Sequence, residues 1–234
     1  CVHMGVTNGG SIEEAPYLWG GYVQVNYTPL ANLVKIPAGL DPTAVAVFAC
    51  PGPTAMHAFR LGAQAGLDWA QIKVAVVQGA GPVGSYAAMY MKAMGVPKVY
   101  VIAKNISAER EALLRKLGVD EVLDLAGGSE AITGKLQAEN GGLGVDLCYE
   151  ASGAPNAFPQ GMNILRNRGI YLVPGQYSNS GGIEIQPQMI TFKALHIIGS
   201  SQYSMSDVRA YLDFLCAHPE LHDTIQQLIS CYPV

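Results

Sequence analysis

Two short stretches of the sequence contain residues whose types and spacing could support chemistry. FACPGPTAMHAF, residues 48–59, sets Cys50 between small apolar residues and a Pro-Gly-Pro turn. GAGPVG, residues 79–84, sets three glycines in the spacing GxGxxG. A cysteine thiolate can bind a metal when other side chains complete the coordination, and closely spaced glycines let main-chain amides approach a phosphate. The elements on either side of each stretch decide whether it can act in this way.

The glycine stretch lies between a predicted strand and a predicted helix. KVAVVQ, residues 73–78, is nearly all apolar, which is typical of a strand buried on both faces. SYAAMYMKAMG, residues 85–95, predicts a helix that ends at Gly95. Pro82 suits the first helical position, because its missing N–H would have no partner there.

Each of the three glycines has a separate physical role in this setting. Gly79 would permit the tight turn, Gly81 would let the backbone approach a pyrophosphate, and Gly84 would let helix and strand pack closely. The strand before and the helix after the motif favour dinucleotide binding over a glycine turn without a ligand.

The end of the second predicted strand, KVYVIA (98–103), bears on which dinucleotide is bound. NAD is normally held there by a carboxylate, but this sequence offers Ala103, Lys104 and Asn105. A small residue followed by a cation would accommodate a 2′-phosphate, so the sequence favours NADP over NAD. The alternative is that Lys104 is a solvated loop residue.

The pattern along the chain predicts an α/β fold. Strands expected at 73–78, 98–103, 121–125, 145–150, 169–173 and 195–199 alternate with helices, one of them capped by Ser107, which predicts a doubly wound six-stranded parallel sheet. Residues 52–203 form this domain in our reading. Residues 1–51 read as part of another, β-rich domain, and residues 204–234 as a helical tail.

Composition excludes several classes of partner. The 234 residues are 50% hydrophobic and 14% charged, with net charge −4 and scattered Lys and Arg, so we expect no nucleic-acid or membrane partner. No apolar run approaches the roughly 20 residues that span a bilayer.

The five cysteines are odd in number and widely spaced, which favours reduced thiols and a cytoplasmic protein. Because the chain opens on Cys1 without a Met, we expect it to be part of a longer protein.

Several stretches together resemble the medium-chain dehydrogenase/reductase family, in its zinc-dependent alcohol and polyol dehydrogenase branch. They are GGYVQVNY, VKIPAGLDP, ACPGPTAMHAF, VVQGAGPVG, AERE with LLRKLGVDEVLDL, VDLCYEASG, RGIYLVPG and KALHIIGSS, in family order from about residue 20 to the end. The resemblance implies hydride transfer between NAD(P) and a secondary alcohol, polyol or ketone, with zinc polarising the oxygen. It also makes residues 1–51 part of a GroES-like catalytic domain.

The resemblance assigns metal ligands as well. Cys50 falls where the third ligand of the catalytic zinc belongs, and the other two would lie upstream of Cys1. Cys1 falls where the last ligand of a structural zinc belongs, although it could be an ordinary cysteine. Thr54 would help to place the nicotinamide. His57 is expected to be a packing histidine, and Cys50 could instead be a small buried hydrophobe.

The resemblance also implies a set of cofactor-binding residues: Thr54, Gly79, Gly81, Pro82, Val83, Gly84, Ala103, Lys104, Asn105, Arg110, Ala151, Ser152, Gly153, Pro174, Gly175 and Ser200. Arg110 would bracket the adenine or cover its own helix. Asp146 and Glu150 are expected to be hydrogen-bonded structural groups.

Two other functions are compatible with the same residues. One is a zinc-free quinone or enone reductase of the same fold, and the other is a non-catalytic NAD(P)-binding protein. The substrate in the leading interpretation is a small alcohol or carbonyl compound. A homodimer or homotetramer is expected, because IEI (183–185) would pair as an exposed strand across a two-fold axis unless it forms a local hairpin.

Overall fold

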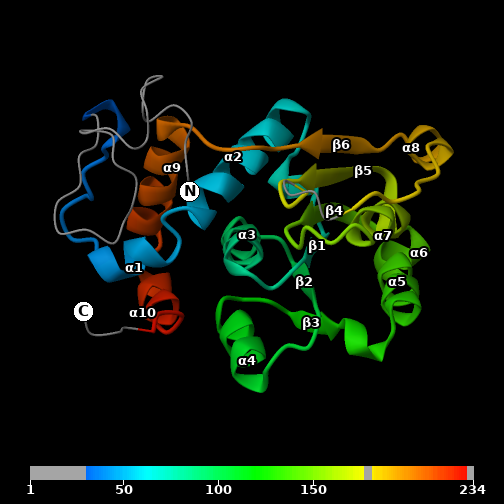
Figure 1. The fold of residues 1–234 in the computed structure, drawn as a ribbon, viewed down its shortest axis with the longest axis horizontal. Helices are drawn as coiled ribbons and strands as arrows, with labels where there is room; N and C mark the ends of the chain where they lie inside the picture. The colour runs from blue at the N-terminus through cyan, green and yellow to red at the C-terminus, as the bar shows by residue number, and fades with distance from the viewer. Residues whose placement is uncertain (1–29, 177–180, 231–234) are drawn as a thin grey trace.

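Six parallel strands form one sheet at the centre of the molecule. The computed structural model describes residues 30–176 and 181–230. The strands lie in the order β3-β2-β1-β4-β5-β6, which confirms the predicted doubly wound sheet (Figure 1). Their bounds are β1 Val74–Gln78, β2 Lys98–Ala103, β3 Glu121–Asp124, β4 Val145–Glu150, β5 Leu165–Val173 and β6 His196–Gly199.

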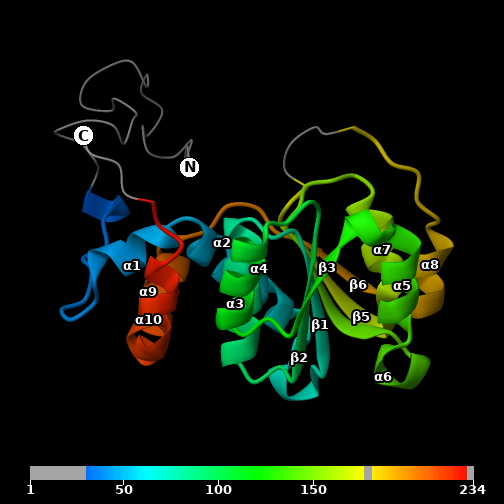
Figure 2. The same cartoon turned by 90° about the horizontal axis from the view of Figure 1, so that it is seen from below.

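Helices cover both faces of the sheet. Their bounds are α1 Pro42–Val47, α2 Pro51–Gln64, α3 Pro82–Ala93, α4 Ala108–Lys116, α5 Ser129–Gln137, α6 Glu139–Gly142, α7 Ala157–Ile164, α8 Gln188–Lys193, α9 Met205–Ala217 and α10 His222–Gln226. Figure 2 shows α3 and α4 on one side of the strands, and α5 and α7 on the other. Within the described residues, no helix is long and apolar enough to cross a membrane.

The central strands are buried on both faces, as their sequences predict. Every residue of β1 and β4 is buried. Leu147 and Tyr149 pack into the core shared with α2, α3 and α9, whereas Cys148, between them, packs into the core beneath α5 and α7. The alternation along β4 therefore divides the interior into two apolar layers, one on each face of the sheet.

The structure departs from the predicted elements chiefly at β5 and at residues 181–186. β5 begins at Leu165, four residues earlier than expected, because its first pair with β4 is followed by a register shift and Arg168 adopts a left-handed conformation (φ 59°). The last helix ends at Gln226 and lacks a side-chain cap at its start. Residues 181–186 form no strand within the chain, and their pairing with a second copy stays a prediction.

Helices α2 and α9 are joined by a buried carboxylate. Asp207, 2% exposed, accepts hydrogen bonds from Arg60 Nε (2.9 Å) and Ser204 N (2.8 Å), and lies 3.0 Å from His57 Nδ1. Burial alone would raise the pKa of Asp207, but the hydrogen bonds from Arg60, Ser204 and His57 outweigh it and hold the pKa well below its usual range. His57 is thus a packing residue in this structure.

Gly52 of α2 lies so close to the ring of Tyr211 of α9 that a Cβ at position 52 would overlap the ring.

We expect Asp207→Asn to lower the free energy of unfolding by about 3 kcal/mol at pH 7, because it breaks a buried ion pair. A depressed folded-state pKa gives stability that is present above the unfolded pKa of about 4 and is lost as pH falls below it, so the difference from wild type should shrink at pH 3. Urea unfolding followed by far-UV circular dichroism measures both values.

Glu111→Gln is the control for Asp207→Asn. It breaks the exposed pair between Glu111 and Arg115 within α4 and should change stability by no more than about 0.5 kcal/mol. Equal losses in the two variants would contradict the role of Asp207 in joining α2 to α9.

Candidate functional site

The carboxyl ends of β1 and β4 mark the point where the sheet reverses its winding. The two strands are hydrogen-bonded neighbours, with Gln78 opposite Glu150. The helices that follow them leave toward opposite faces, α3 to one side and α7 to the other (Figure 2). Open α/β sheets bind ligands in the crevice at such a point.

The glycine turn after β1 has the close contacts that its sequence predicts. Gly79 has φ 107°, a conformation that a side chain disfavours, and a Cβ there would lie 2.9 Å from Ser152 N. A Cβ on Gly84 would overlap Gly79 O. A Cβ on Gly81 would meet nothing within 4 Å, so this glycine faces open space at the edge of the sheet. Two of the glycines are therefore required by the fold, and the third leaves room for a ligand.

Helix α3 begins directly at this open space. Pro82 is its first residue, as predicted, and no side chain caps the helix at Gly81. The amides of Val83 and Gly84 belong to this uncapped first turn, where the helix dipole favours an anion. A twelve-residue helix that starts behind a glycine turn is a suitable site for a diphosphate.

Arg110 reaches from α4 to the glycine turn. Its Nη2 donates to Ala80 O at 3.0 Å and to Ser85 Oγ at 2.9 Å. Ser85 Oγ in turn donates to Gly81 O at 2.9 Å. Partial burial lowers the pKa of Arg110. The guanidinium therefore fixes the carbonyls of the turn and does not lie along its own helix.

The end of β2 contains one feature that sequence reasoning missed. Ala103 is buried, while Lys104 and Asn105 are exposed, and Asn105 has φ 54°. Asp124, opposite Ala103 in the register, accepts from Asn105 N at 3.2 Å and Ala126 N at 2.9 Å. The Ala126 N–H bond, together with that from Asn105, lowers the pKa of Asp124. The sequence contained a signal for this role of Asp124, since an Asp that ends a strand before a short turn is a typical cap.

Two further turns form the opposite wall of the crevice. Ala151 and Ser152 lie against Gly79, and Ala151 N donates to Gln78 O at 2.8 Å. A Cβ on Gly153 would come within 2.9 Å of Gly175 O. The structure therefore brings the predicted residues 151–153 and 174–175 together.

Ser200 lies beside this wall, at the end of β6. Its amide donates to Val173 O at 3.3 Å, while its hydroxyl is buried and has no partner among the described residues. The predicted Ser200 is thus held in place by its backbone, with its side chain uncommitted.

The two acids of β4 differ in their surroundings. Asp146 Oδ2 accepts from the amides of Lys73 and Val74, both at 2.9 Å, and Oδ1 pairs with Arg166. Burial raises the pKa of Asp146, but these hydrogen bonds lower it more. Asp146 is therefore the structural group that was predicted. Glu150, at the other end of the strand, is satisfied on one oxygen only.

Cys50 and Thr54 lie one helical turn apart at the start of α2. Cys50 precedes the helix, and Thr54 Oγ1 donates to Cys50 O at 2.9 Å. The Cys50 sulfur is disulfide-bonded, in contrast to the reduced thiol expected from the sequence, whereas Cys148 and Cys216 are free. Cys1, the predicted structural-zinc ligand, lies outside the described residues.

The described residues do not by themselves form a metal site. No three His, Cys, Asp or Glu side chains within residues 30–176 and 181–230 lie close enough together to hold a metal ion. A catalytic zinc needs three protein ligands, and Cys50 supplies at most one of them. The ligand assignment of Cys50 stays a prediction.

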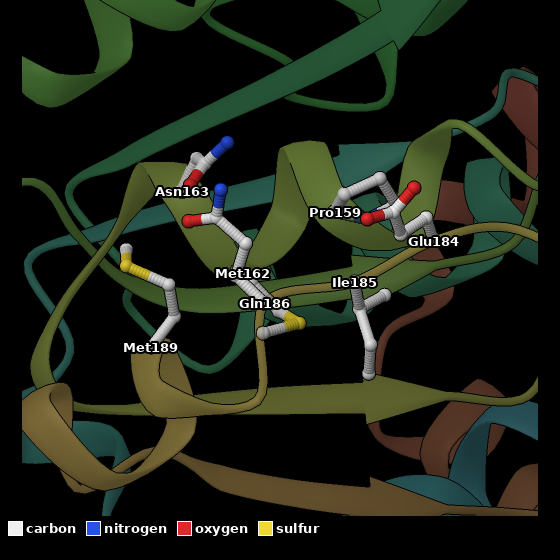
Figure 3. A pocket seen from close by; sticks show the side chains of 7 residues that line it. All are labelled: Pro159, Met162, Asn163, Glu184, Ile185, Gln186 and Met189. Carbon is white, nitrogen blue, oxygen red and sulfur yellow. The ribbon is translucent and has the colours of Figure 1, made fainter.

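A small pocket opens between α7 and the segment before α8 (Figure 3). Its volume is about 210 Å³, and its lining is Pro159, Met162, Asn163, Glu184, Ile185, Gln186 and Met189. None of the predicted site residues lines it. This pocket is smaller than most ligand sites, and it is separate from the glycine turn.

Comparison with known proteins agrees with this geometry. A family model described as zinc-binding dehydrogenase matches residues 82–217. The chain is 32% identical over 185 residues to 5-exo-hydroxycamphor dehydrogenase of Pseudomonas putida, an alignment that covers 78% of this chain and 50% of that protein. It is 34% identical over 174 residues to L-threonine 3-dehydrogenase of Bacillus velezensis, covering 72% of this chain and 44% of that protein.

A solved structure shows the same arrangement of elements. An alcohol dehydrogenase from Thermotoga maritima superimposes with a TM-score of 0.74 at 25% identity, over 84% of this chain and 52% of that chain. The fold and the glycine turn are typical of dinucleotide-binding α/β domains. The chain belongs to the zinc-binding dehydrogenase family, and the resemblance to medium-chain dehydrogenases/reductases is confirmed. It spans about half the length of the curated relatives it matches.

The same substitution at two glycines should separate folding from binding. Gly84→Ala should lower the free energy of unfolding by about 2 to 3 kcal/mol, because the new Cβ overlaps Gly79 O. Gly81→Ala should cost no more than about 1 kcal/mol, since it meets no protein atom. The added methyl should nevertheless weaken cofactor binding at least about tenfold by occupying the approach to α3. Thermal unfolding and fluorescence titration with NADPH measure the two effects, and wild-type affinity in Gly81→Ala would contradict a diphosphate site there.

Proposed function

We propose that this chain contains the NAD(P)-binding part of a dehydrogenase that acts on a secondary alcohol or polyol, or on the corresponding ketone. The open approach at Gly81, directly before the uncapped start of α3, carries this proposal. The relatives named as dehydrogenases of hydroxycamphor and threonine support the reaction class.

The proposed reaction removes a hydride and a proton from an alcohol. When bound, a nicotinamide cofactor accepts the hydride from the carbon that bears the hydroxyl, and the hydroxyl proton is released, leaving a ketone. The residues of this chain would bind and orient that cofactor. The turn at Gly79–Gly84 would hold the diphosphate, residues 151–153 and 174–175 with Ser200 would form the wall along the cofactor, and Thr54 would place the nicotinamide.

The direct test is turnover by the intact protein. Oxidation of secondary alcohols with NADP⁺ or NAD⁺, or reduction of ketones with the reduced cofactor, is followed by absorbance of the reduced nicotinamide. Binding of the nucleotide without turnover of any compound in a broad panel would favour the non-catalytic alternative.

We further propose that the cofactor is NADP, because Lys104 is exposed at the end of β2 and no carboxylate occupies residues 103–105. Lys104→Ala should raise the Kd for NADPH about tenfold and leave that for NADH within about twofold, since it removes one charge-assisted contact to the 2′-phosphate. Lys92→Ala is the matched control, because Lys92 pairs with Asp120 away from this turn. Equal weakening of NADPH and NADH in Lys104→Ala would contradict the assignment.

We also propose Cys50 as a ligand of a catalytic zinc whose other protein ligands lie outside the described residues. Binding as a thiolate requires that the disulfide at Cys50 be reduced. After reduction, Cys50→Ser should hold one fewer zinc per chain than wild type and should lose turnover. Cys216→Ser, which removes an exposed free thiol, should match wild type.

Elemental analysis of the intact, reduced protein with each variant measures the zinc content. Full turnover in Cys50→Ser, together with insensitivity to chelators, would overturn the zinc assignment and favour a zinc-free quinone or enone reductase. We propose the cytoplasm as the compartment of this protein. We also propose a homodimer or homotetramer as its assembly, and light scattering of the purified protein tests the assembly.

A further inference from the structure

Glu150 is a buried acid whose two carboxylate oxygens differ in their hydrogen-bond partners. It is the last residue of β4, and its side chain is 0% exposed. Oε1 accepts from Ser152 N at 2.7 Å, from Ser152 Oγ at 2.6 Å and from Gly153 N at 2.9 Å. Oε2 has no hydrogen-bond partner among the described residues and is shielded from solvent. A buried polar atom without a partner is costly and requires an explanation.

The turn that Glu150 holds is one on which the cofactor crevice depends. Residues 151 and 152 are the backbone against which Gly79 packs, so the position of this turn sets that of the glycine turn. On the other side, a Cβ on Gly175 would overlap Glu150 Oε2, and Gly175 N donates to Glu150 O at 3.0 Å. Glu150 therefore fixes the turn at residues 151–153, and this turn contacts the turns at Gly79 and Gly175 at the point where the sheet reverses its winding.

Asp146 shows that β4 can hold a fully satisfied acid. It lies near the amino end of the same strand, where two backbone amides, Asn140 and Arg166 serve both of its oxygens. No cation in the described part of the chain pairs with Glu150. Burial raises the pKa values of Cys148, Tyr149 and Tyr171, and the nearby Glu150 raises them further. A negative charge on Glu150 would therefore lie at the carboxyl edge of the sheet with no salt bridge from the described residues to neutralise it.

We propose that Glu150 is a positioning residue of the cofactor site and that its unpaired charge favours the oxidised nicotinamide over the reduced one. This inference rests on the proposed binding of a nicotinamide cofactor at the same edge. The oxidised ring carries a positive charge and the reduced ring carries none, so a fixed negative charge nearby stabilises only the oxidised form. The consequence is that the bound cofactor accepts a hydride less readily, so the equilibrium on the enzyme shifts toward reduction of the ketone.

The test compares dissociation constants for the two redox forms in the intact protein. The probes are NADP⁺ and NADPH, or NAD⁺ and NADH if wild type binds that pair more tightly. Glu150→Gln should raise the ratio of the Kd of the oxidised form to the Kd of the reduced form at least about fourfold. This is the effect that one unit charge has on another up to about 20 Å away at an effective dielectric constant near 20. A purely structural role would weaken both forms equally and leave the ratio unchanged.

Two control variants separate charge from shape. Asp146→Asn removes a buried charge from the other end of β4 and should leave the ratio within about twofold of wild type, because that charge is paired with Arg166 and lies farther from the carboxyl edge. Ser152→Ala removes one donor to Oε1 but keeps the charge, so it should weaken both forms by the same factor. If Glu150→Gln does not fold, Glu150→Asp and Glu150→Asn form a second pair that differs only in charge, and the same difference in ratio is expected between them.

An unchanged ratio in Glu150→Gln, or in the Asp and Asn pair, overturns the inference while leaving the proposed function intact. Failure of wild type to bind either redox form would instead overturn the proposed function. The two failures are therefore distinguishable in one set of titrations.

Discussion

The crevice at the carboxyl edge of the sheet depends on a close approach of two backbones, at Gly79 after β1 and at Ala151–Ser152 after β4. A side chain at Gly79 would meet those backbone atoms at about 3 Å, and one at Gly84 would overlap Gly79 O. Because neighbouring parallel strands lie about 4.8 Å apart, the turns that leave them have little room at this point. The glycines provide this room, and the positions of α3, the turn at 151–153 and Gly175 follow from it.

The sequence was most informative where a residue's role is decided by its immediate neighbours. Short apolar runs that alternate with helical stretches predicted the strands, and the cap of α4 at Ser107 was confirmed by its bond to Arg110 N. The glycine turn could be predicted for the same reason, since strand, turn and helix are contiguous. Asp146 was also read correctly as structural, because a charge within a buried strand needs hydrogen-bond partners.

Side-chain pairs that are distant in the sequence were not predictable. Asp207 and Arg60 are separated by 147 positions and meet only because α9 packs on α2. Arg110 could not be placed on the glycine turn from its own helix, and the unsatisfied oxygen of Glu150 becomes visible only when the turns around it are assembled. The bulge in β5 similarly arises from pairing with β4, since no local signal in Leu165–Arg168 marks it.

The strand order also has a consequence for how the chain folds during synthesis. β1, β2 and β3 are neighbours in one half of the sheet and leave the ribosome first, whereas β4, β5 and β6 form the other half and follow. Synthesis releases the chain from its N-terminal side onward. The nascent first half can therefore pair early, but β1 keeps an open edge until residues 145–150 of β4 have been translated. The seam between β1 and β4 can close from that point on, whereas the crevice also needs residues 174–175 and Ser200 and is completed only after β5 and β6 have emerged.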